Sequence, residues 1–264
     1  NGVLTGKARS FGGSLIRPEA TGFGAVYYLE SVMKHEHDTL EGKTVAVAGF
    51  GNVAWGVVQK LSELGAKPVT LSGPDGYIYD PDGITTKEKF DFMLEMRASG
   101  RNKVQDYADK FGCKFVAGDK PWGEKVDIIM PCATQNDVDL TQAKRIVANN
   151  IKYYIEVANM PTTNEALRFL MDQKNMVVAP SKAVNAGGVL VSGLEMSQNS
   201  ERLSWTFEEV DGKLKGIMET IYANISDAAK RYDMTVGGKT DYVAGANIAG
   251  FEKVVDAMLA QGVC

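Results

Sequence analysis

The sequence feature that most constrains the fold is a glycine-rich juncture near residue 50. The apolar run Thr44 to Ala48 leads into Gly49-Phe50-Gly51, and residues 52–65 then have the pattern of a helix closed by a glycine. This order predicts a buried strand, a tight turn and a helix, and it matches the GxGxx[GA] pattern of nucleotide-binding βαβ units. In that pattern the first glycine permits the turn, the second lets the backbone approach a pyrophosphate, and the third small residue, here Ala54, lets the helix pack closely on the strand.

The same juncture predicts an anion-binding site. The first N–H groups of a helix have no partner within the helix, and the helix dipole makes that end positive. We therefore expect the backbone around the helix start to bind the phosphates of a dinucleotide. The residues assigned to this turn are Gly49, Phe50, Gly51, Asn52 and Val53. The alternative, which this pattern alone leaves open, is a glycine turn that only packs a helix on a strand.

The rest of the chain alternates short apolar segments with helical sequence. Further strands are expected at 67–71, 113–116, 126–130, 153–157 and 176–179. Helices are expected at about 18–35, 86–97, 103–110, 185–198, 206–232 and 246–262. This alternation predicts an α/β fold: a doubly wound, Rossmann-like, mostly parallel sheet with flanking helices and a helical C-terminal extension.

Composition limits the functional classes. The net charge of −4 and the absence of a dense Lys/Arg stripe give no electrostatic support for nucleic-acid binding. Cys113, Cys132 and Cys264 are odd in number and share no metal-type spacing, so we expect neither a disulfide framework nor a metal site. No apolar run reaches membrane length, and a cytoplasmic location is expected. The polar, glycine-rich start without methionine leads us to expect further residues upstream.

Three polar turns follow predicted strands, at the edge where a doubly wound sheet binds ligands. They are Pro131-Cys132-Ala133-Thr134-Gln135-Asn136, Glu156-Val157-Ala158-Asn159-Met160-Pro161-Thr162-Thr163, and the turn from Pro180 to Val189 that contains Asn185. Their amides and hydroxyls suit hydrogen bonds to a ribose or a carboxamide, because they bring polarity without charge. Helix capping is the alternative use of such residues.

Taken together, these segments resemble the cofactor-binding domain of the glutamate dehydrogenases, in their small hexameric bacterial form. The stretches that carry the resemblance are residues 12–22 (GGSLIRPEATG), 49–54 (GFGNVA), 131–136 (PCATQN), 158–163 (ANMPTT), 182–198 (KAVNAGGVLVSGLEMSQ) and 245–251 (GANIAGF). They span essentially the whole chain. The family's N-terminal domain contains substrate-binding lysines, a catalytic lysine and a catalytic aspartate. No segment of this chain resembles that domain, so we assign no catalytic residue here.

The resemblance implies a domain division and a reaction. Residues 1–12 would form an interdomain linker, 13–245 the dinucleotide-binding domain, and 246–264 a helix returning toward the absent substrate domain. The implied reaction is the reversible oxidative deamination of L-glutamate to 2-oxoglutarate and ammonia, with hydride transfer to a nicotinamide cofactor. The full-length protein would be a homohexamer, whereas this fragment would be inactive alone and could be monomeric.

The resemblance also assigns residues to the ligands. Toward the cofactor it assigns Arg17, Thr21, Ala133, Thr134, Gln135, Asn159 and Asn185. Val189 and Ser192 are assigned to the γ-carboxylate of glutamate, where a hydroxyl can discriminate strongly against analogues that lack a hydrogen-bonding group. Ser192 therefore argues against the alternative of a branched-chain or aromatic amino-acid dehydrogenase. A third possibility is a module that senses NAD without catalysis.

The choice between NAD and NADP depends on the end of the second strand. An acidic group there accepts hydrogen bonds from the ribose 2′-OH and repels a 2′-phosphate. Asp75 is the acidic residue in the turn Ser72 to Gly76, which contains no Arg or Lys. The sequence therefore favours NAD, with NADP or dual use as alternatives if Asp75-Gly76 is turn chemistry alone.

Replacing this carboxylate tests the assignment. We expect Asp75→Ser to raise the affinity for NADP, because a 2′-phosphate would no longer meet a negative charge. The measurement is a pair of fluorescence titrations with NADH and NADPH. A ratio of the two affinities that does not change would count against a cofactor role for Asp75.

Overall fold

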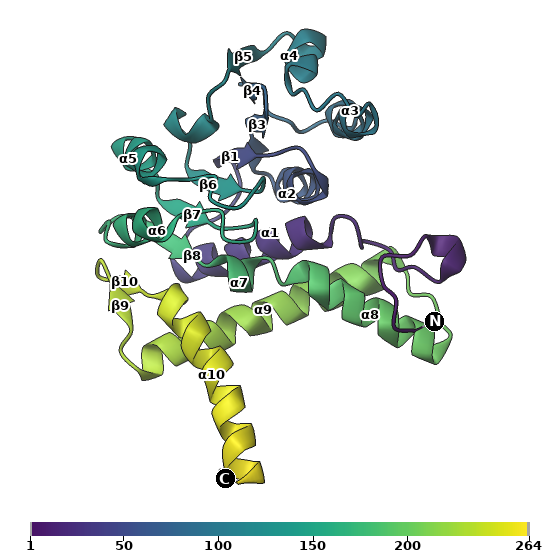
Figure 1. Cartoon of the computed structure of the whole chain (residues 1–264), viewed down its shortest axis with the longest axis vertical. Coiled ribbons are helices and arrows are strands. Elements are labelled where there is room, and N and C mark those ends of the chain that lie inside the picture. Colours follow the sequence, from purple (N-terminus) through teal and green to yellow (C-terminus); the bar gives the residue numbers. More distant parts are fainter. Residues whose placement is uncertain (1, 263–264) are drawn as a thin grey trace.

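The computed structural model describes residues 2–262, which form a parallel sheet with helices on both faces (Figure 1). Five strands pair in the order β2-β1-β6-β7-β8, and each pairing is parallel. Their bounds are β1 (Thr44–Ala48), β2 (Lys67–Pro68), β6 (Ile128–Pro131), β7 (Tyr153–Ile155) and β8 (Val177–Ala179). Because all five run the same way, their carboxyl ends share one edge of the sheet. The expected α/β class is confirmed.

The sheet is buried on both faces, and this explains its apolar strands. In β1, Val45 and Val47 point into one core while Ala46 and Ala48 point into the other. The helices that cover the first face are α1 (Ala20–His35) and α2 (Asn52–Glu63), and those on the second face are α5 (Leu140–Ala148) and α6 (Asn164–Met171). The small alanines of β1 leave room for the bulky side chain of Trp122, which is fully buried on the second face.

An antiparallel unit extends the fold beyond β2. Its strands are β3 (Thr70–Gly73), β4 (Gly76–Tyr79) and β5 (Lys114–Ala117), and its helices are α3 (Lys87–Ala98) and α4 (Gln105–Phe111). The strand expected at 67–71 is divided into β2 and β3. The strand expected at 113–116 is present as β5, but it pairs antiparallel with β4, which the sequence analysis did not predict. The polar turn before β4 connects β3 and β4 as a tight hairpin.

Within residues 2–262, four helices follow the sheet. They are α7 (Ser181–Val184), α8 (Gly187–Glu201), α9 (Phe207–Arg231) and α10 (Tyr242–Gln261), with a small hairpin of β9 (Thr235–Val236) and β10 (Lys239–Thr240) before the last. Helix α9 starts with the capping box of Thr206 and Glu209. Helix α10 starts before the expected residue 246, because the Asp241 side chain accepts a hydrogen bond from the Ala244 N–H (2.8 Å) and caps it. None of the described helices has the length and apolarity needed to cross a membrane.

Helices α1 and α2 approach each other closely enough to exclude side chains. A Cβ added at Gly22 would lie 2.4 Å from the backbone nitrogen of Val57, and one added at Gly56 would lie 2.5 Å from the backbone carbonyl oxygen of Glu19. Both distances are far below van der Waals contact, so the two backbones touch through their glycines. This contact fixes α1 against the helix that starts at the glycine turn.

Adding one methyl group at this contact should destabilise the fold. We expect Gly22→Ala to lower the free energy of unfolding by roughly 1–3 kcal/mol, since the helices must separate to accept it. Gly216→Ala in α9 is the matched control, because its Cβ would meet nothing within 4 Å, and alanine there should raise stability by about 1 kcal/mol. Urea unfolding of both variants measures the difference, and equal effects would contradict the close-contact argument.

Candidate functional site

The turn after β1 has the geometry that the glycine pattern predicts. Gly49 has a φ of 85°, its N–H donates to the Ser72 hydroxyl (2.9 Å), and an added Cβ would lie 3.2 Å from the Cα of Ala133. Both the left-handed backbone and the close approach favour glycine. Gly51 then serves as the N-cap of α2, and no side chain of the described residues caps it. The first N–H groups of α2 are therefore available to a ligand.

A groove of about 810 Å³ lies on one side of this turn; we name it the turn groove. The predicted site residues in its lining are Gly49, Phe50, Gly51, Ala133 and Thr134. Ser72, Gly73 and Pro74 form the part of the wall that comes from β3 and the turn after it. This groove therefore runs from the glycine turn toward the antiparallel unit.

A second groove, of about 710 Å³, lies on the other side and is named here the amide groove. The predicted site residues in its lining are Arg17, Thr21, Val53, Ala133, Gln135, Asn159, Asn185, Val189 and Ser192. Ala133 lines both grooves, so they adjoin in front of the start of α2. Two grooves that meet at a helix N-terminus suit a ligand with two halves joined by an anionic group, because the helix N-terminus favours negative charge.

The amide groove contains polar groups from three parts of the chain. The Asn185 side-chain amide donates to the side-chain Oδ1 of Asn159 (2.7 Å), so the turns after β7 and β8 are joined at this point. Asn185 is the C-cap of α7 and does not begin α8, which excludes the N-cap alternative for this residue. The Nε atom of Arg17 is buried without a hydrogen-bond partner among the described residues. A buried donor without a partner is uncommon, and here it belongs to a charged side chain that lines the groove.

Helix α8 forms the outer wall of the amide groove. The Ser192 hydroxyl donates to the Gly188 carbonyl (3.1 Å) and accepts a hydrogen bond from the Thr5 hydroxyl (3.3 Å). Val189 is 70% exposed one turn earlier on the helix. The Ser192 hydroxyl and the apolar Val189 side chain, three residues apart on α8, thus both line the amide groove.

Comparison with known proteins identifies the family of this chain. The family model described as glutamate/leucine/phenylalanine/valine dehydrogenase matches residues 12–262. The chain belongs to this family. This match confirms the resemblance on which the site residues were assigned.

Several family members are close in sequence. The chain is 77% identical to the NAD-specific glutamate dehydrogenase of Clostridium symbiosum, over 100% of this chain and 58% of that protein. It is 54% identical to the NAD(P)-specific enzyme of Xylanibacter ruminicola and 49% identical to the NADP-specific enzyme of Escherichia coli, over 99% of this chain and 58% and 57% of those proteins. The chain thus spans a little under three-fifths of the length of these relatives.

Solved structures of the family match equally well. One glutamate dehydrogenase structure superposes with a TM-score of 0.96 at 77% identity, covering 100% of this chain and 58% of that one. The enzyme of Plasmodium falciparum superposes with a TM-score of 0.92 at 44% identity, over 99% of this chain and 55% of that one. This chain therefore shares its fold with those structures along almost all of its length.

Two predicted site residues are absent from both groove linings. Asn52 is exposed in the first turn of α2. The Asp75 carboxylate accepts hydrogen bonds from the N–H groups of Val104 and Gln105 (3.0 Å each), so it holds the start of α4. This contact gives Asp75 a structural role of its own, and its role toward a cofactor stays a prediction.

The sequence analysis missed charged residues that line the grooves. Arg97, Asp119 and Lys120 line the turn groove, and Lys182 lines the amide groove and bonds to Asn247 of α10. The first three come from α3 and from the loop after β5, which no local pattern connects with the glycine turn. Lys182 begins the stretch 182–198 that carries the family resemblance. Its position three residues after β8, at the ligand-binding edge of the sheet, could have indicated a place in the groove.

Buried groups near the edge support the loops. The Glu156 side chain at the end of β7 is buried, which raises the pKa of its carboxyl, and it accepts a hydrogen bond from the Ser181 N–H (3.1 Å). It thereby joins the end of β7 to the start of α7. Cys132 is buried as well, and burial raises the pKa of its thiol, as expected for a packing residue.

The ion pair in the wall of the turn groove should make stability depend on pH. Hydrogen bonds from Arg145 (2.7 and 2.9 Å) hold the pKa of the Asp119 carboxyl below its usual value. A carboxyl whose pKa is lower in the folded state than in the unfolded state stabilises the fold when the pH is above its unfolded-state pKa of about 3.9. That stabilisation is lost as the pH falls through the folded-state pKa. The free energy of unfolding of Asp119→Asn should therefore decrease less between pH 7 and pH 3 than that of the unsubstituted chain, as measured by urea unfolding. The exposed Asp109 on α4 provides the control variant, Asp109→Asn, and a loss of stability identical in both variants would contradict the assignment.

Proposed function

We propose that this chain is the cofactor-binding part of a glutamate dehydrogenase. The enzyme would catalyse the reversible oxidative deamination of L-glutamate to 2-oxoglutarate and ammonia. The observation that carries the proposal is the pair of grooves that meet at Ala133, in front of the start of α2, with Ser192 in the lining of the amide groove. Glutamate dehydrogenases of three bacteria, at 49–77% identity, support it.

The residues of the grooves fit a nicotinamide dinucleotide. A Cβ added at Gly51 would meet nothing within 4 Å, so the backbone there is open to a ligand, and the N–H groups of Asn52 and Val53 begin the helix next to it. Arg17 supplies a buried donor without a partner at the amide groove. In this arrangement the turn groove would hold the adenosine half. The amide groove would hold the nicotinamide half, with Thr21 donating to the carboxamide and Asn159 to the ribose.

The chemistry is divided between cofactor and protein. A bound nicotinamide supplies the acceptor for the hydride that leaves the α-carbon of glutamate. The residues of this chain supply alignment and the exclusion of water, which lower the barrier by holding the reacting atoms in position. No residue here is assigned to proton transfer, and the catalytic groups would belong to the part of the protein that this chain does not span.

The substrate side of the amide groove favours glutamate among the family's amino acids. The Ser192 hydroxyl suits the γ-carboxylate, because a site built around a hydrogen bond rejects substrates that cannot form it. Leucine, phenylalanine and valine offer no such group, and a dehydrogenase for those amino acids would be expected to have an apolar residue at position 192. This argues against a branched-chain or aromatic amino-acid dehydrogenase.

NAD is the proposed cofactor. The relative that is 77% identical is NAD-specific, whereas the NADP-specific enzyme of E. coli is 49% identical. Lys120, a cation in the turn groove, is paired with Asp137 (2.8 Å), which reduces its availability to a 2′-phosphate. Arg97 also lines this groove, so use of NADP in addition to NAD is the alternative.

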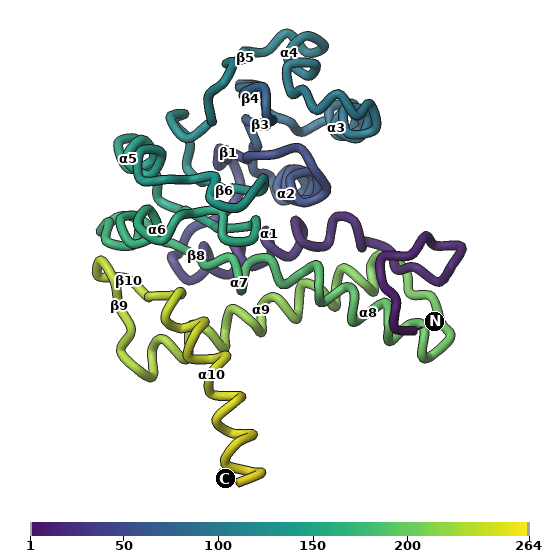
Figure 2. Tube along the Cα trace, viewed as in Figure 1, coloured from purple at the N-terminus to yellow at the C-terminus, as the bar shows by residue number. Residues whose placement is uncertain are grey.

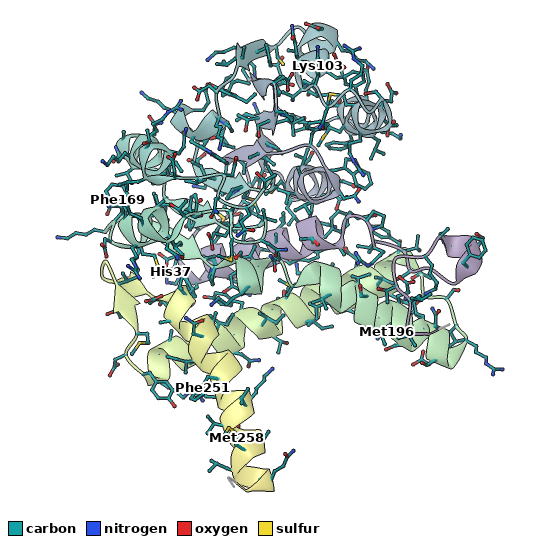
Figure 3. The ribbon with its side chains drawn as sticks, in the orientation of Figure 1. His37, Lys103, Phe169, Met196, Phe251 and Met258 are labelled. Atoms are coloured by element: carbon teal, nitrogen blue, oxygen red, sulfur yellow. The ribbon has the colours of Figure 1, made fainter. Side chains whose placement is uncertain are left out.

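The full-length enzyme would assemble as a homohexamer in the cytoplasm. A relative from Thermus thermophilus, 26% identical with a TM-score of 0.79, is a hetero-hexameric glutamate dehydrogenase. Helix α10 extends away from the sheet and exposes Phe251 and Met258 (Figure 3), as expected for a helix that returns toward the absent domain. Cys113 and Cys132 are free thiols, which fits a reducing compartment.

A glycine contact in the amide groove tests cofactor binding. A Cβ added at Gly188 would lie 2.5 Å from the Thr21 hydroxyl oxygen, so Gly188→Ala should displace that hydroxyl. We expect the Kd for NADH to rise about fivefold, the scale of one lost hydrogen bond. Gly193→Ala on the same helix adds a methyl group in open space and should bind NADH normally. Calorimetric titration of this chain measures both, and no binding by the folded, unsubstituted chain would overturn the proposal.

Activity measurements on this chain and on the full-length protein separate the enzyme from a module that only senses NAD. The chain alone should bind NAD weakly and show no glutamate-dependent reduction of it, whereas the full-length protein should show such reduction. Absorbance at the NADH band measures turnover. A full-length protein that binds NAD without oxidising glutamate would favour the sensing module.

A further inference from the structure

A buried carboxylate on α8 holds the N-terminal segment against that helix. The side chain of Glu195 is 0% exposed and accepts hydrogen bonds from the Gly6 N–H (2.9 Å) and the Lys7 ammonium (2.6 Å). Burial alone raises the pKa of this carboxyl, but the hydrogen bonds from Lys7 and Gly6 outweigh it, and the pKa is lowered. Glu195 is therefore ionised at neutral pH and fully paired.

The same face of α8 contacts the segment at two further points. Ser192, Glu195 and Asn199 are spaced three and four residues apart, which places them on one side of the helix. Asn199 donates to the Gly12 carbonyl (2.7 Å), and Ser192 accepts from the Thr5 hydroxyl (3.3 Å). Figure 2 shows the N-terminal segment lying next to α8. The anchor at Glu195 thus lies between the contact with Gly12 and the contact at the amide groove.

We propose that Glu195 is a positioning residue for the substrate end of the amide groove. By fixing Gly6 and Lys7, its carboxylate holds Thr5 next to Ser192, whose side chain lines the groove. The inference rests on the proposed function, in which Ser192 faces the substrate side chain. Gly6 has a φ of 79°, which favours glycine, and a Cβ added there would meet nothing within 4 Å. Without the anchor this glycine-containing segment would regain its conformational freedom.

Kinetics of the full-length enzyme test this role with Glu195→Gln, which keeps the shape of the side chain and removes its charge. We expect the KM for glutamate to rise about tenfold, the scale of a lost hydrogen bond to a charged group. The kcat and the KM for NAD should change by less than about twofold, because only substrate binding is weakened. The Gly6 and Lys7 amides should exchange hydrogen faster. Glu201→Gln, the same change at the exposed end of α8, should behave as the unsubstituted enzyme.

A second pair of variants tests the anchor from the other side. Lys7→Met should raise the KM for glutamate as Glu195→Gln does, whereas Lys7→Arg should keep it low, because a guanidinium also donates to a carboxylate. This pair decides the question if Glu195→Gln does not fold. An unchanged KM for glutamate, or unchanged exchange at Gly6 and Lys7, would overturn the positioning role. Absence of glutamate turnover in the unsubstituted enzyme would overturn the proposed function itself.

Discussion

The left-handed turn at Gly49 is the constraint on which the whole ligand edge depends. Its N–H bonds to Ser72 on β3, and its missing Cβ lets the backbone of Ala133 approach from the loop after β6. Three separate segments therefore meet at one residue without a side chain. A Cβ at this position would lie 3.2 Å from the Cα of Ala133, the residue that lines both grooves, and would displace it. The turn also directs the start of α2 toward that junction, where the helix dipole favours an anion.

Glycine contacts also position the helices around the grooves. A Cβ at Gly24 of α1 would lie 2.8 Å from the Cα of Gly187 at the start of α8, so these helices also touch through backbone. Helix α1 brings Thr21 into the amide groove, and α8 brings Ser192. Carboxylates then fix the loops: Asp75 holds the start of α4, and Glu195 holds the N-terminal segment. In these contacts negative charge stabilises backbone that would otherwise move.

Much of the fold could be predicted because its signals are local. The strand, turn and helix of residues 44–63 follow from an apolar run, two glycines and a helical pattern in continuous sequence. Strand β4 was missed although it pairs with β3 across a tight turn, because the turn was assigned to the cofactor and not to a hairpin. Its second partner, β5, comes after α3 and α4, and pairing over that separation leaves no local signal. Asp75 illustrates the same limit. Its position after the second strand is visible in the sequence, but its bonds to Val104 and Gln105 depend on where α4 lies.

The sequence by itself determined the class of fold, the family and the edge of the sheet where polar residues gather. These follow from short-range rules: glycine permits the turn, apolar strands are buried on both faces, and parallel strands end on one side. Only the tertiary structure decided which polar groups face the grooves and which support loops. Arg97, Lys120 and Glu195 acquire their surroundings from segments distant in the chain. Burial and hydrogen-bond geometry, which select between those two roles, exist only after the chain has packed.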